Sequence, residues 1–391
     1  MSPMSRREFF GTVAGAAIAS NGSTRKAPPA DDAPEEPKAA LIHATDLFRP
    51  HADPDDHFDL ATVFSLAAQS RLELLAVMID HPPAGLDADP DVQAVAQLNR
   101  LAGLAVPVLT GCSRRLSPAE ASLPENRADV GGVMTLLRLM RASSRPVLIS
   151  VVGCCRDVAL AGRLEPKLFA AKCAGVYLNA GSGTRERAKA ARLEYNVNLD
   201  PASYADIFNL PCPVYWLPCF EVVPGEGEAM ASGEFGTYYR FLQKDVLDHL
   251  SPRLQNYFAF MFKQGDADRA QQSEAAALRP SWLRTLEGPR DEALLERQGS
   301  RFRNMWSTAG FFQMAGLSVT GRGVLVEGPA GPPDHPVYAF DPVRIRVGAD
   351  GISEWSSDPS SRNRYLFHVR DPERYPQAMT AALAALLSTL K

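Results

Sequence analysis

The sequence predicts an α/β fold, with a mostly parallel (mixed) central sheet flanked by helices and a helical cap insertion. Short apolar runs alternate with helix-length segments from residue 39 onward, which is typical of strand-helix-strand units around a parallel sheet. A dense acidic cluster follows the first apolar run, where ligands bind in such sheets. The 391 residues, 46% of them hydrophobic, are sufficient for a large core.

The first half of the chain supplies the elements of this sheet. Six apolar runs are predicted to be buried parallel strands: 39–44, 72–79, 106–111, 145–153, 173–181 and 213–218. The segments between them have helical periodicity: 60–70, 91–104, 131–143, 156–164 and 200–209.

Residues 220–310 break the alternation. They contain a Gly/Glu-rich loop and then an aromatic, helix-like segment that includes YYRFLQKDVL. They are interpreted as a helical cap over the strand ends, and a separate subdomain stays open as an alternative. The C-terminal part again has strand-like segments, at 336–348 and 365–369, with an expected hairpin through GADG. A helix at 375–390 is predicted to end the domain.

The N-terminus indicates export. Residues 1–20 place Arg6-Arg7 before an apolar, small-residue stretch, which is typical of a twin-arginine signal. Residues 21–38 are rich in Pro, Ala and charge, so they are predicted to be a disordered linker before a domain that spans 39–391. We therefore expect a periplasmic or extracellular protein without a membrane span. The net charge of −4 and the scattered basic residues argue against nucleic acid.

Six cysteines occur, none with CxxC spacing and most inside apolar runs. Structural thiols are the favoured interpretation. A disulfide, which an exported protein can form, and a zinc site stay open as alternatives.

The acidic cluster DLFRPHADPDDHFDLATVF, residues 46–64, admits several kinds of site. A calcium loop of the EF-hand type fails because Phe58 and Phe64 stand where Gly and Glu are needed. A DxDxT nucleophile also fails, since Leu47-Phe48-Arg49 follows Asp46. A zinc site made by His43, His51 and His57 is a weaker alternative.

A metal-centred site explains the cluster better. Asp46 ends the first strand, and Asp55 and Asp56 stand at the expected start of the next helix, where exposed N–H groups favour carboxylates. Hard oxygen ligands that converge from a strand end and a helix start would suit Ca²⁺. Asp53, which precedes Pro54, competes with Asp46 for the role of first aspartate.

At this point the sequence resembles the inosine-uridine-type nucleoside hydrolase family. That family's first strand runs into D-x-D-P-x-x-D-D, which Asp46 and Asp55-Asp56 resemble apart from the insertion LFRPHADP. The segment LEYNVNLDPASY is similar to the family's E-x-N-x-x-x-D-P-x-A. Further similar segments follow the family's order: LELLAVMIDHP, PVLTG, VLISVVGCCRDVALAGRLEP, GVYLNAGS and Phe340-Asp341-Pro342.

The resemblance implies roles for individual residues. Asp46, Asp56, Asp341 and the Val152 carbonyl would hold Ca²⁺, and Asp46 would accept the proton of a metal-bound water. Sugar hydroxyls would contact the residues Asp55, Asp80, Asn179, Glu194 and Asn196. The sequence departs from the family at three positions, with Phe340 in place of a histidine acid, Asp80 in place of an Asn and Val152 in place of a Thr.

The resemblance therefore implies a calcium-dependent N-glycosidase that hydrolyses a ribonucleoside or related pentoside with a metal-activated water. Phe340 can only stack on or wall off the leaving group, so inosine is expected to be a poor substrate, and His51 or His57 is a candidate for the missing acid. The alternative is an exported calcium-dependent sugar- or nucleoside-binding protein without hydrolase activity. The calcium-dependent hydrolase requires Asp46, Asp55, Asp56 and Asp341 to meet at one point beside Glu194. Homo-oligomer formation stays open.

Overall fold

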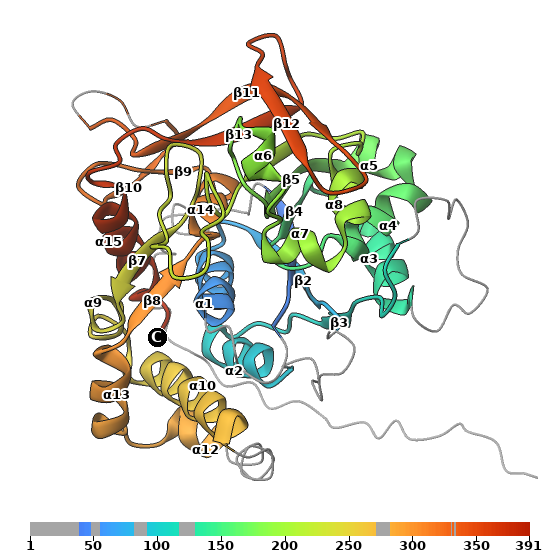
Figure 1. Ribbon diagram of the computed structural model, residues 1–391. Coiled ribbons are helices and arrows are strands. Elements are labelled where there is room, and N and C mark those ends of the chain that lie inside the picture. The colour runs from blue at the N-terminus through green and yellow to red at the C-terminus, as the bar shows by residue number, and fades with distance from the viewer. Residues whose placement is uncertain are drawn as a thin grey trace, which may run out of the picture. The chain divides into compact units, whose positions relative to one another are not determined.

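A nine-stranded sheet organises the computed structural model (Figure 1). The structure describes residues 39–47, 55–81, 92–116, 130–270, 282–329, 331 and 334–391. The predicted export signal, the predicted linker, His51 and Asp53 lie outside these ranges. The strand order is β12-β11-β13-β6-β5-β4-β1-β2-β3, and every neighbouring pair from β13 to β3 is parallel, whereas β11 and β12 run antiparallel.

The parallel strands coincide with the predicted apolar runs. Both faces of this part of the sheet are covered, so the strands bury consecutive side chains rather than alternate ones. Their bounds are β1 Ala40–Thr45, β2 Glu73–Ile79, β3 Val108–Thr110, β4 Val147–Val151, β5 Cys173–Asn179, β6 Val214–Leu217 and β13 Arg364–Val369. The antiparallel edge is formed by β11 Tyr338–Val347 and β12 Ser353–Ser357.

Helices cover the two faces of the sheet (Figure 1). One apolar cluster joins the sheet to α3 Gly131–Ala142, α4 Arg156–Leu164 and α8 Pro201–Ile207, and α5 Pro166–Lys172 lies beside them. The other cluster joins it to α1 Asp55–Ala68, α2 Val92–Ala102, α14 Thr308–Met314 and α15 Tyr375–Leu387. The short helices α6 Arg187–Ala190 and α7 Tyr195–Leu199 follow β5.

The region 220–310 is less helical than predicted. It contains α9 Lys244–Leu247, α10 Pro252–Ala270, α12 Trp282–Glu287 and α13 Glu292–Gly299. However, Tyr239–Leu242 forms strand β7, which pairs antiparallel with β8 Phe302–Met305. The expectation of a helix there is wrong because buried Tyr239 and Phe241 alternate with exposed Arg240, which is the period of a strand. A further hairpin, β9 Leu317–Val319 with β10 Leu325–Glu327, was not predicted.

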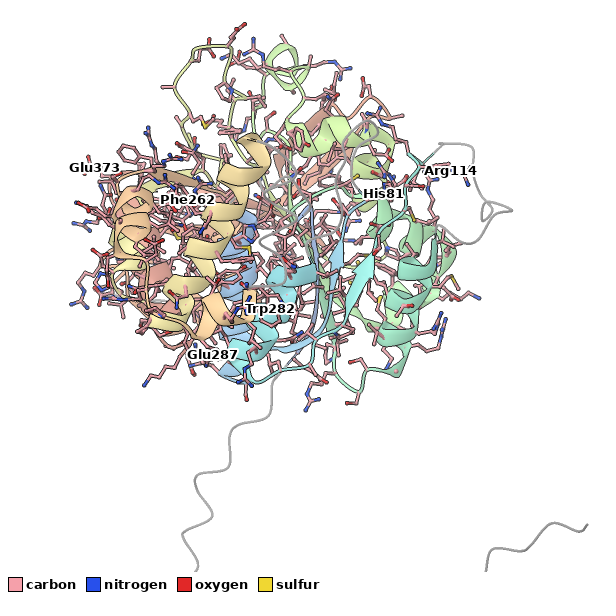
Figure 2. The ribbon with its side chains drawn as sticks, turned by 90° about the horizontal axis from the view of Figure 1, so that it is seen from below. His81, Arg114, Phe262, Trp282, Glu287 and Glu373 are labelled. Carbon is pink, nitrogen blue, oxygen red and sulfur yellow. The ribbon has the colours of Figure 1, made fainter. Side chains whose placement is uncertain are left out.

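An ionic contact joins the helices of this region to the main body. Glu287 at the end of α12 accepts hydrogen bonds from Arg253 of α10 at 2.6 Å and from Arg100 of α2 at 3.3 Å. Figure 2 shows Glu287 and Trp282 on α12, with Phe262 farther along α10. Exposed ion pairs of this kind contribute little individually, so the apolar contacts of α10 with α2 hold the region in place.

Candidate active site at the strand ends

The carboxyl ends of β1, β2 and β4 meet at one edge of the sheet and carry three of the predicted site residues. The Asp80 N–H bonds the Thr45 carbonyl oxygen at 2.9 Å, and the Val152 N–H bonds the Ala44 carbonyl oxygen at 2.9 Å. Asp46, Asp80 and Val152 are therefore neighbours, each directly after its strand. Adjacent parallel strands of matched length place successive chain ends side by side, as the order of the motifs predicts.

Asp80 is a buried carboxyl group in this cluster. Its Oδ2 accepts a short hydrogen bond from the Cys154 N–H, and no described group hydrogen-bonds to its Oδ1. Burial raises the pKa of Asp80 well above its usual value, and the charges of Asp157 and Asp46 raise it further. Asp80 therefore holds its proton to a higher pH than an exposed aspartate does.

Gly153 allows this close arrangement of strand ends. A Cβ atom at position 153 would lie 2.4 Å from the Asp80 Oδ2, 2.7 Å from the Asp46 nitrogen and 2.9 Å from the Asp46 Cβ. These distances are shorter than real van der Waals contacts, and one of the neighbours is backbone, so only glycine fits without displacing β1.

The N-terminus of α1 adds two more carboxylates. Asp55 and Asp56 are its first residues, and both are buried. The Thr45 hydroxyl donates to Asp56 Oδ1 at 2.9 Å, which fixes the helix start against the end of β1. The exposed N–H groups of a helix start favour carboxylates at this place.

Glu194 and Asn196 reach the same edge from α7. Glu194 is the N-cap residue, and its two oxygens accept from the Gly181 N–H at 2.9 Å and from the Asn196 N–H at 3.0 Å. Burial raises the pKa of Glu194, although the backbone donors oppose the shift. The Asn196 amide donates to the Val152 carbonyl oxygen at 2.9 Å, whereas its Oδ1 is buried and accepts from no described group.

Asn179 is the last residue of β5, and its side-chain amide is already hydrogen-bonded to other protein groups. Its amide nitrogen donates to the Leu217 carbonyl oxygen at 2.8 Å and to the Thr237 hydroxyl at 3.1 Å. Its Oδ1 accepts from the Ser307 hydroxyl at 3.0 Å. Asn179 thus positions the surrounding elements, and a sugar contact would require one of these bonds to break.

Ser307 belongs to a part of the site that the sequence reasoning missed. Residues Trp306 and Ser307 lead from β8 into α14, and the Trp306 ring packs with Phe220 and Tyr238 at centroid distances of 5.9 and 5.7 Å. The Trp306 indole N–H is buried and donates to no described group. A strand-like FRNM followed by W-S-T and an apolar run was the available signal, because Ser and Thr commonly begin helices.

Asp341 and Phe340 do not join this group. They lie on β11, and β13, β6, β5 and β4 stand between β11 and β1, a separation of about 24 Å at ~4.8 Å per strand. The Asp341 carboxylate instead accepts from His368 Nδ1 at 2.6 Å and from Arg370. The expected meeting of Asp341 with Asp46 is corrected for this reason. Phe340 packs edge-on against Tyr177 and other rings of the sheet.

The histidines proposed as zinc ligands or as a replacement acid also have other surroundings. His43 is fully buried in β1, with its Nδ1 2.8 Å from the Ser150 hydroxyl and its ring against Phe311. His57 Nδ1 lies 3.3 Å from the Tyr257 hydroxyl of α10. These two histidines therefore contact different elements, and the zinc alternative is not supported.

The predicted calcium ligands can be compared with this geometry. Within the described ranges, no three His, Cys, Asp or Glu side chains are arranged to hold a metal ion. Asp341 lies five strands away from Asp46 across the sheet, so one of the four predicted ligands is absent from this place. The described residues therefore do not fit the predicted four-ligand calcium site.

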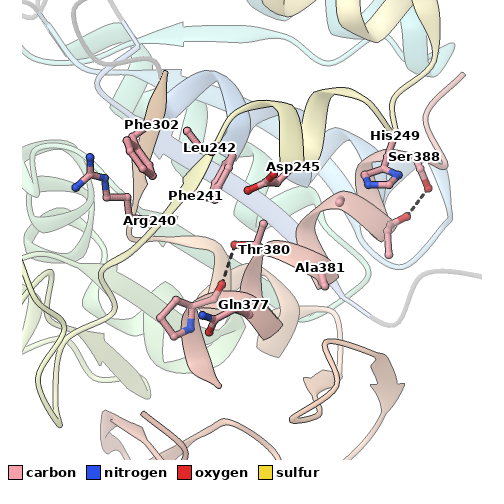
Figure 3. A pocket seen from close by; sticks show the side chains of 13 residues that line it. Arg240, Phe241, Leu242, Asp245, His249, Phe302, Gln377, Thr380, Ala381 and Ser388 are labelled. Atoms are coloured by element: carbon pink, nitrogen blue, oxygen red, sulfur yellow. Dashed lines mark hydrogen bonds between the residues drawn. The ribbon is translucent and has the colours of Figure 1, made fainter. Parts of the chain in front are cut away.

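Of two hollows in the surface, one lies next to this edge of the sheet and the other lies away from it. A cavity of about 620 Å³ opens at the ends of β2 and β3 and is lined by His81, Thr110 and Gly132 among others. Figure 2 shows His81 and Arg114 on that side of the molecule. A groove of about 860 Å³ runs instead between β7, α9 and α15, past Phe302 and Thr380, and includes none of the predicted site residues (Figure 3).

All six cysteines are buried free thiols, as the favoured interpretation predicted. Among the described residues, no helix is both long and apolar enough to span a membrane.

The chain is similar to solved structures over most of its length. An inosine-guanosine nucleoside hydrolase is 14% identical, with a TM-score of 0.47, and the match covers 88% of this chain and 98% of that one. A plant nucleoside hydrolase is 14% identical, with a TM-score of 0.48 and coverages of 89% and 99%. The type III effector XopQ, solved with adenosine diphosphate ribose, is 16% identical, with a TM-score of 0.43 and coverages of 90% and 94%.

No family model and no curated protein sequence matches the chain.

Proposed function

We propose that the chain binds a ribonucleoside or related pentoside at the strand-end site and hydrolyses its N-glycosidic bond. One observation carries the proposal: Asp80 Oδ1 and Asn196 Oδ1 are buried at this edge with no described hydrogen-bond partner. Leaving such an atom unpaired costs about 1–3 kcal/mol, so a ligand rich in hydroxyl groups would satisfy both.

The arrangement of side chains supports one orientation of the ligand in the site. Asp46, Asp80 and Asn196 surround the ends of β1, β2 and β4, whereas Trp306 and its ring partners lie toward β5 and β6. The pentose would occupy the acidic end. A flat aromatic base would stack on the Trp306 ring.

The reaction follows from these groups. Asp46 accepts a proton from a water molecule, which attacks the anomeric carbon as the carbon–nitrogen bond breaks. The bonding electron pair leaves with the base, and the base takes a proton from solvent. The carboxylates of Asp55 and Asp56 stabilise the positive charge that develops on the sugar, and Asp80, whose pKa is raised by burial, is placed to contact a hydroxyl.

A second candidate is a pentoside-binding protein without hydrolase activity. It is favoured by the position of Asp341, which removes the last predicted metal ligand and leaves Asp46 to activate water alone.

The test measures reducing sugar released from nucleosides and p-nitrophenyl pentosides, with Ca²⁺ and with chelator. We expect Asp46→Asn to lower kcat at least 100-fold and Asp341→Asn, the matched control, to leave it within about twofold. Saturable binding heat without sugar release would favour the binding protein. No binding and no release would refute the site itself, and loss of activity in Asp341→Asn or with chelator would restore the metal-centred prediction.

We also propose that residues 1–20 direct export, on the strength of Arg6-Arg7 and the following apolar stretch. Residues 1–38 fused to a folded reporter should carry it to the periplasm, and the pair of substitutions Arg6→Lys and Arg7→Lys should retain it in the cytoplasm. Export of the doubly substituted fusion would contradict the assignment.

A further inference from the structure

Two cysteines lie side by side at the end of the sheet opposite the proposed site. Cys173 is the first residue of β5, and Cys212 stands two residues before β6, the parallel neighbour of β5. Val176 pairs with Val214, so the chain at Cys173 and the chain at Cys212 pass next to each other. Each thiol is the largest influence on the pKa of the other, raising that of Cys173 and lowering that of Cys212.

A bulge explains why the two thiols share one face. The register of β5 against β4 shifts after Cys173, which pairs with Val147, so that Gly175 pairs with Leu148 and exposed Ala174 is the extra residue. Without the bulge, Cys173 and Val176 would point to opposite faces. With it, Cys173 and Cys212 both lie in the apolar cluster under α4 and α8.

Arg364 gives one of the two thiols a distinct environment. Its guanidinium donates to the carbonyl oxygens of Cys212 at 2.9 Å, Phe208 at 2.7 Å and Leu210 at 2.8 Å. The Cys173 hydrogen bond and then the Arg364 charge lower the pKa of Cys212. Burial and neighbouring charges instead raise the pKa values of Cys154 and Cys155, the adjacent pair beside Asp80.

We propose that Cys173 and Cys212 form a reversible disulfide, with Cys212 as the attacking thiol and Cys173 as the resolving thiol. Continuing the pairing of Val176 with Val214 places Cys212 one residue out of step with Cys173. Strands ~4.8 Å apart with a rise of ~3.3 Å per residue put Cα atoms at that offset about 6 Å apart, within the range of roughly 4.4–6.8 Å that a disulfide needs. The bond would fasten β5 to the turn before β6 and would close the segment that carries Glu194 and Asn196.

A small-molecule disulfide such as oxidised glutathione is a sufficient oxidant. The Cys212 thiolate attacks one glutathione sulfur, which forms a mixed disulfide and releases one glutathione thiolate. Cys173 then loses its proton to solvent, and its thiolate attacks the Cys212 sulfur and expels the second glutathione. Two protein thiols are oxidised, and one glutathione disulfide is reduced to two thiols.

The test counts thiols by mass after alkylation in denaturant. The full chain is incubated with oxidised glutathione, both in the native state and during refolding from urea in the same buffer. We expect alkylated thiols to fall from six to four, and a peptide map to show the linked peptides of Cys173 and Cys212. Six alkylated thiols in both arms, or a link between any other pair, would overturn the proposal.

Single variants assign the two roles. Cys173→Ser should trap a mixed disulfide with glutathione on Cys212. Cys212→Ser should slow the native reaction at least tenfold, because the thiol with the lowered pKa is gone. Cys112→Ser is the matched control and should still lose two thiols. Equal behaviour of Cys173→Ser and Cys212→Ser would refute the division of roles.

Discussion

Buried His43 should make the fold sensitive to mild acid. Its ring is fully buried between Ser150 and Phe311, and burial lowers its pKa from 6.5 to about 3. In the unfolded chain the ring takes up a proton near pH 6.5, whereas in the fold it stays neutral. The contribution of the neutral His43 ring to the free energy of unfolding is therefore fully present above pH 6.5 and is lost as the pH falls from 6.5 toward 3.

The loss of unfolding free energy at pH 5 is set mainly by the pKa of the His43 ring in the unfolded chain. At that pH the unfolded ring is almost fully protonated and the folded ring is not, so the loss is 1.5 pH units at ~1.36 kcal/mol each, about 2 kcal/mol. Any folded-state pKa below ~4.5 gives nearly the same loss, since the proton taken up in the unfolded state sets it.

The assay is urea unfolding at pH 8 and pH 5 of the wild type, His43→Asn and His249→Asn. His43→Asn should reduce the pH-dependent loss by about 2 kcal/mol, because the titrating ring is absent. His249 is exposed, so its variant should behave as the wild type does. Comparing the two pH values within each protein removes the packing cost of the substitution. An unchanged loss in His43→Asn would refute the buried neutral histidine.

Three further substitutions test the strand-end site. Gly153→Ala would place a methyl group 2.4 Å from the Asp80 Oδ2, so it should cost about 1–3 kcal/mol in urea unfolding and abolish pentoside binding by calorimetry. Gly131→Ala, with open space around its Cβ, is its control and should be neutral or stabilising; equal losses would contradict the close packing. Trp306→Leu should raise KM for nucleosides at least tenfold but leave binding of free D-ribose within twofold, and an equal effect on both would remove the stacking role. Glu194→Gln turns one acceptor into a donor facing an N–H group, so unfolding should become easier by about 1–3 kcal/mol, and unchanged stability would refute the described bonds.

The parallel core was predictable from the sequence because its signals are local. Runs such as VLIS and GVYLN are apolar on both faces, and each predicted strand up to residue 218 overlaps an observed one. The start of α1 at Asp55 was likewise anticipated, since carboxylates mark helix starts in the chain itself. Helix α7, which Glu194 caps, was not predicted; Glu194 and Asn196 had been singled out only by the family resemblance.

The lateral order of the strands is not local information. Asp341 follows strand text just as Asp46 does, and nothing near it in the chain says that β13 separates β11 from β6. Trp306 and Ser307 were missed because they lie at the start of one short helix, in a region that had been predicted to be only a helical cap. Chemistry-bearing residues could be recognised, but their meeting depended on contacts far apart in sequence.

The position of β13 inside the sheet has a consequence for synthesis. This strand, near the C-terminus, pairs on one side with β6 and on the other with β11. While the ribosome is still adding the last thirty or so residues, β6 has an open edge and β11 has no place to dock. Chains that stop before residue 364 should consequently be held by chaperones or degraded rather than released as shortened proteins. Where export of folded protein is required, such chains would also stay behind.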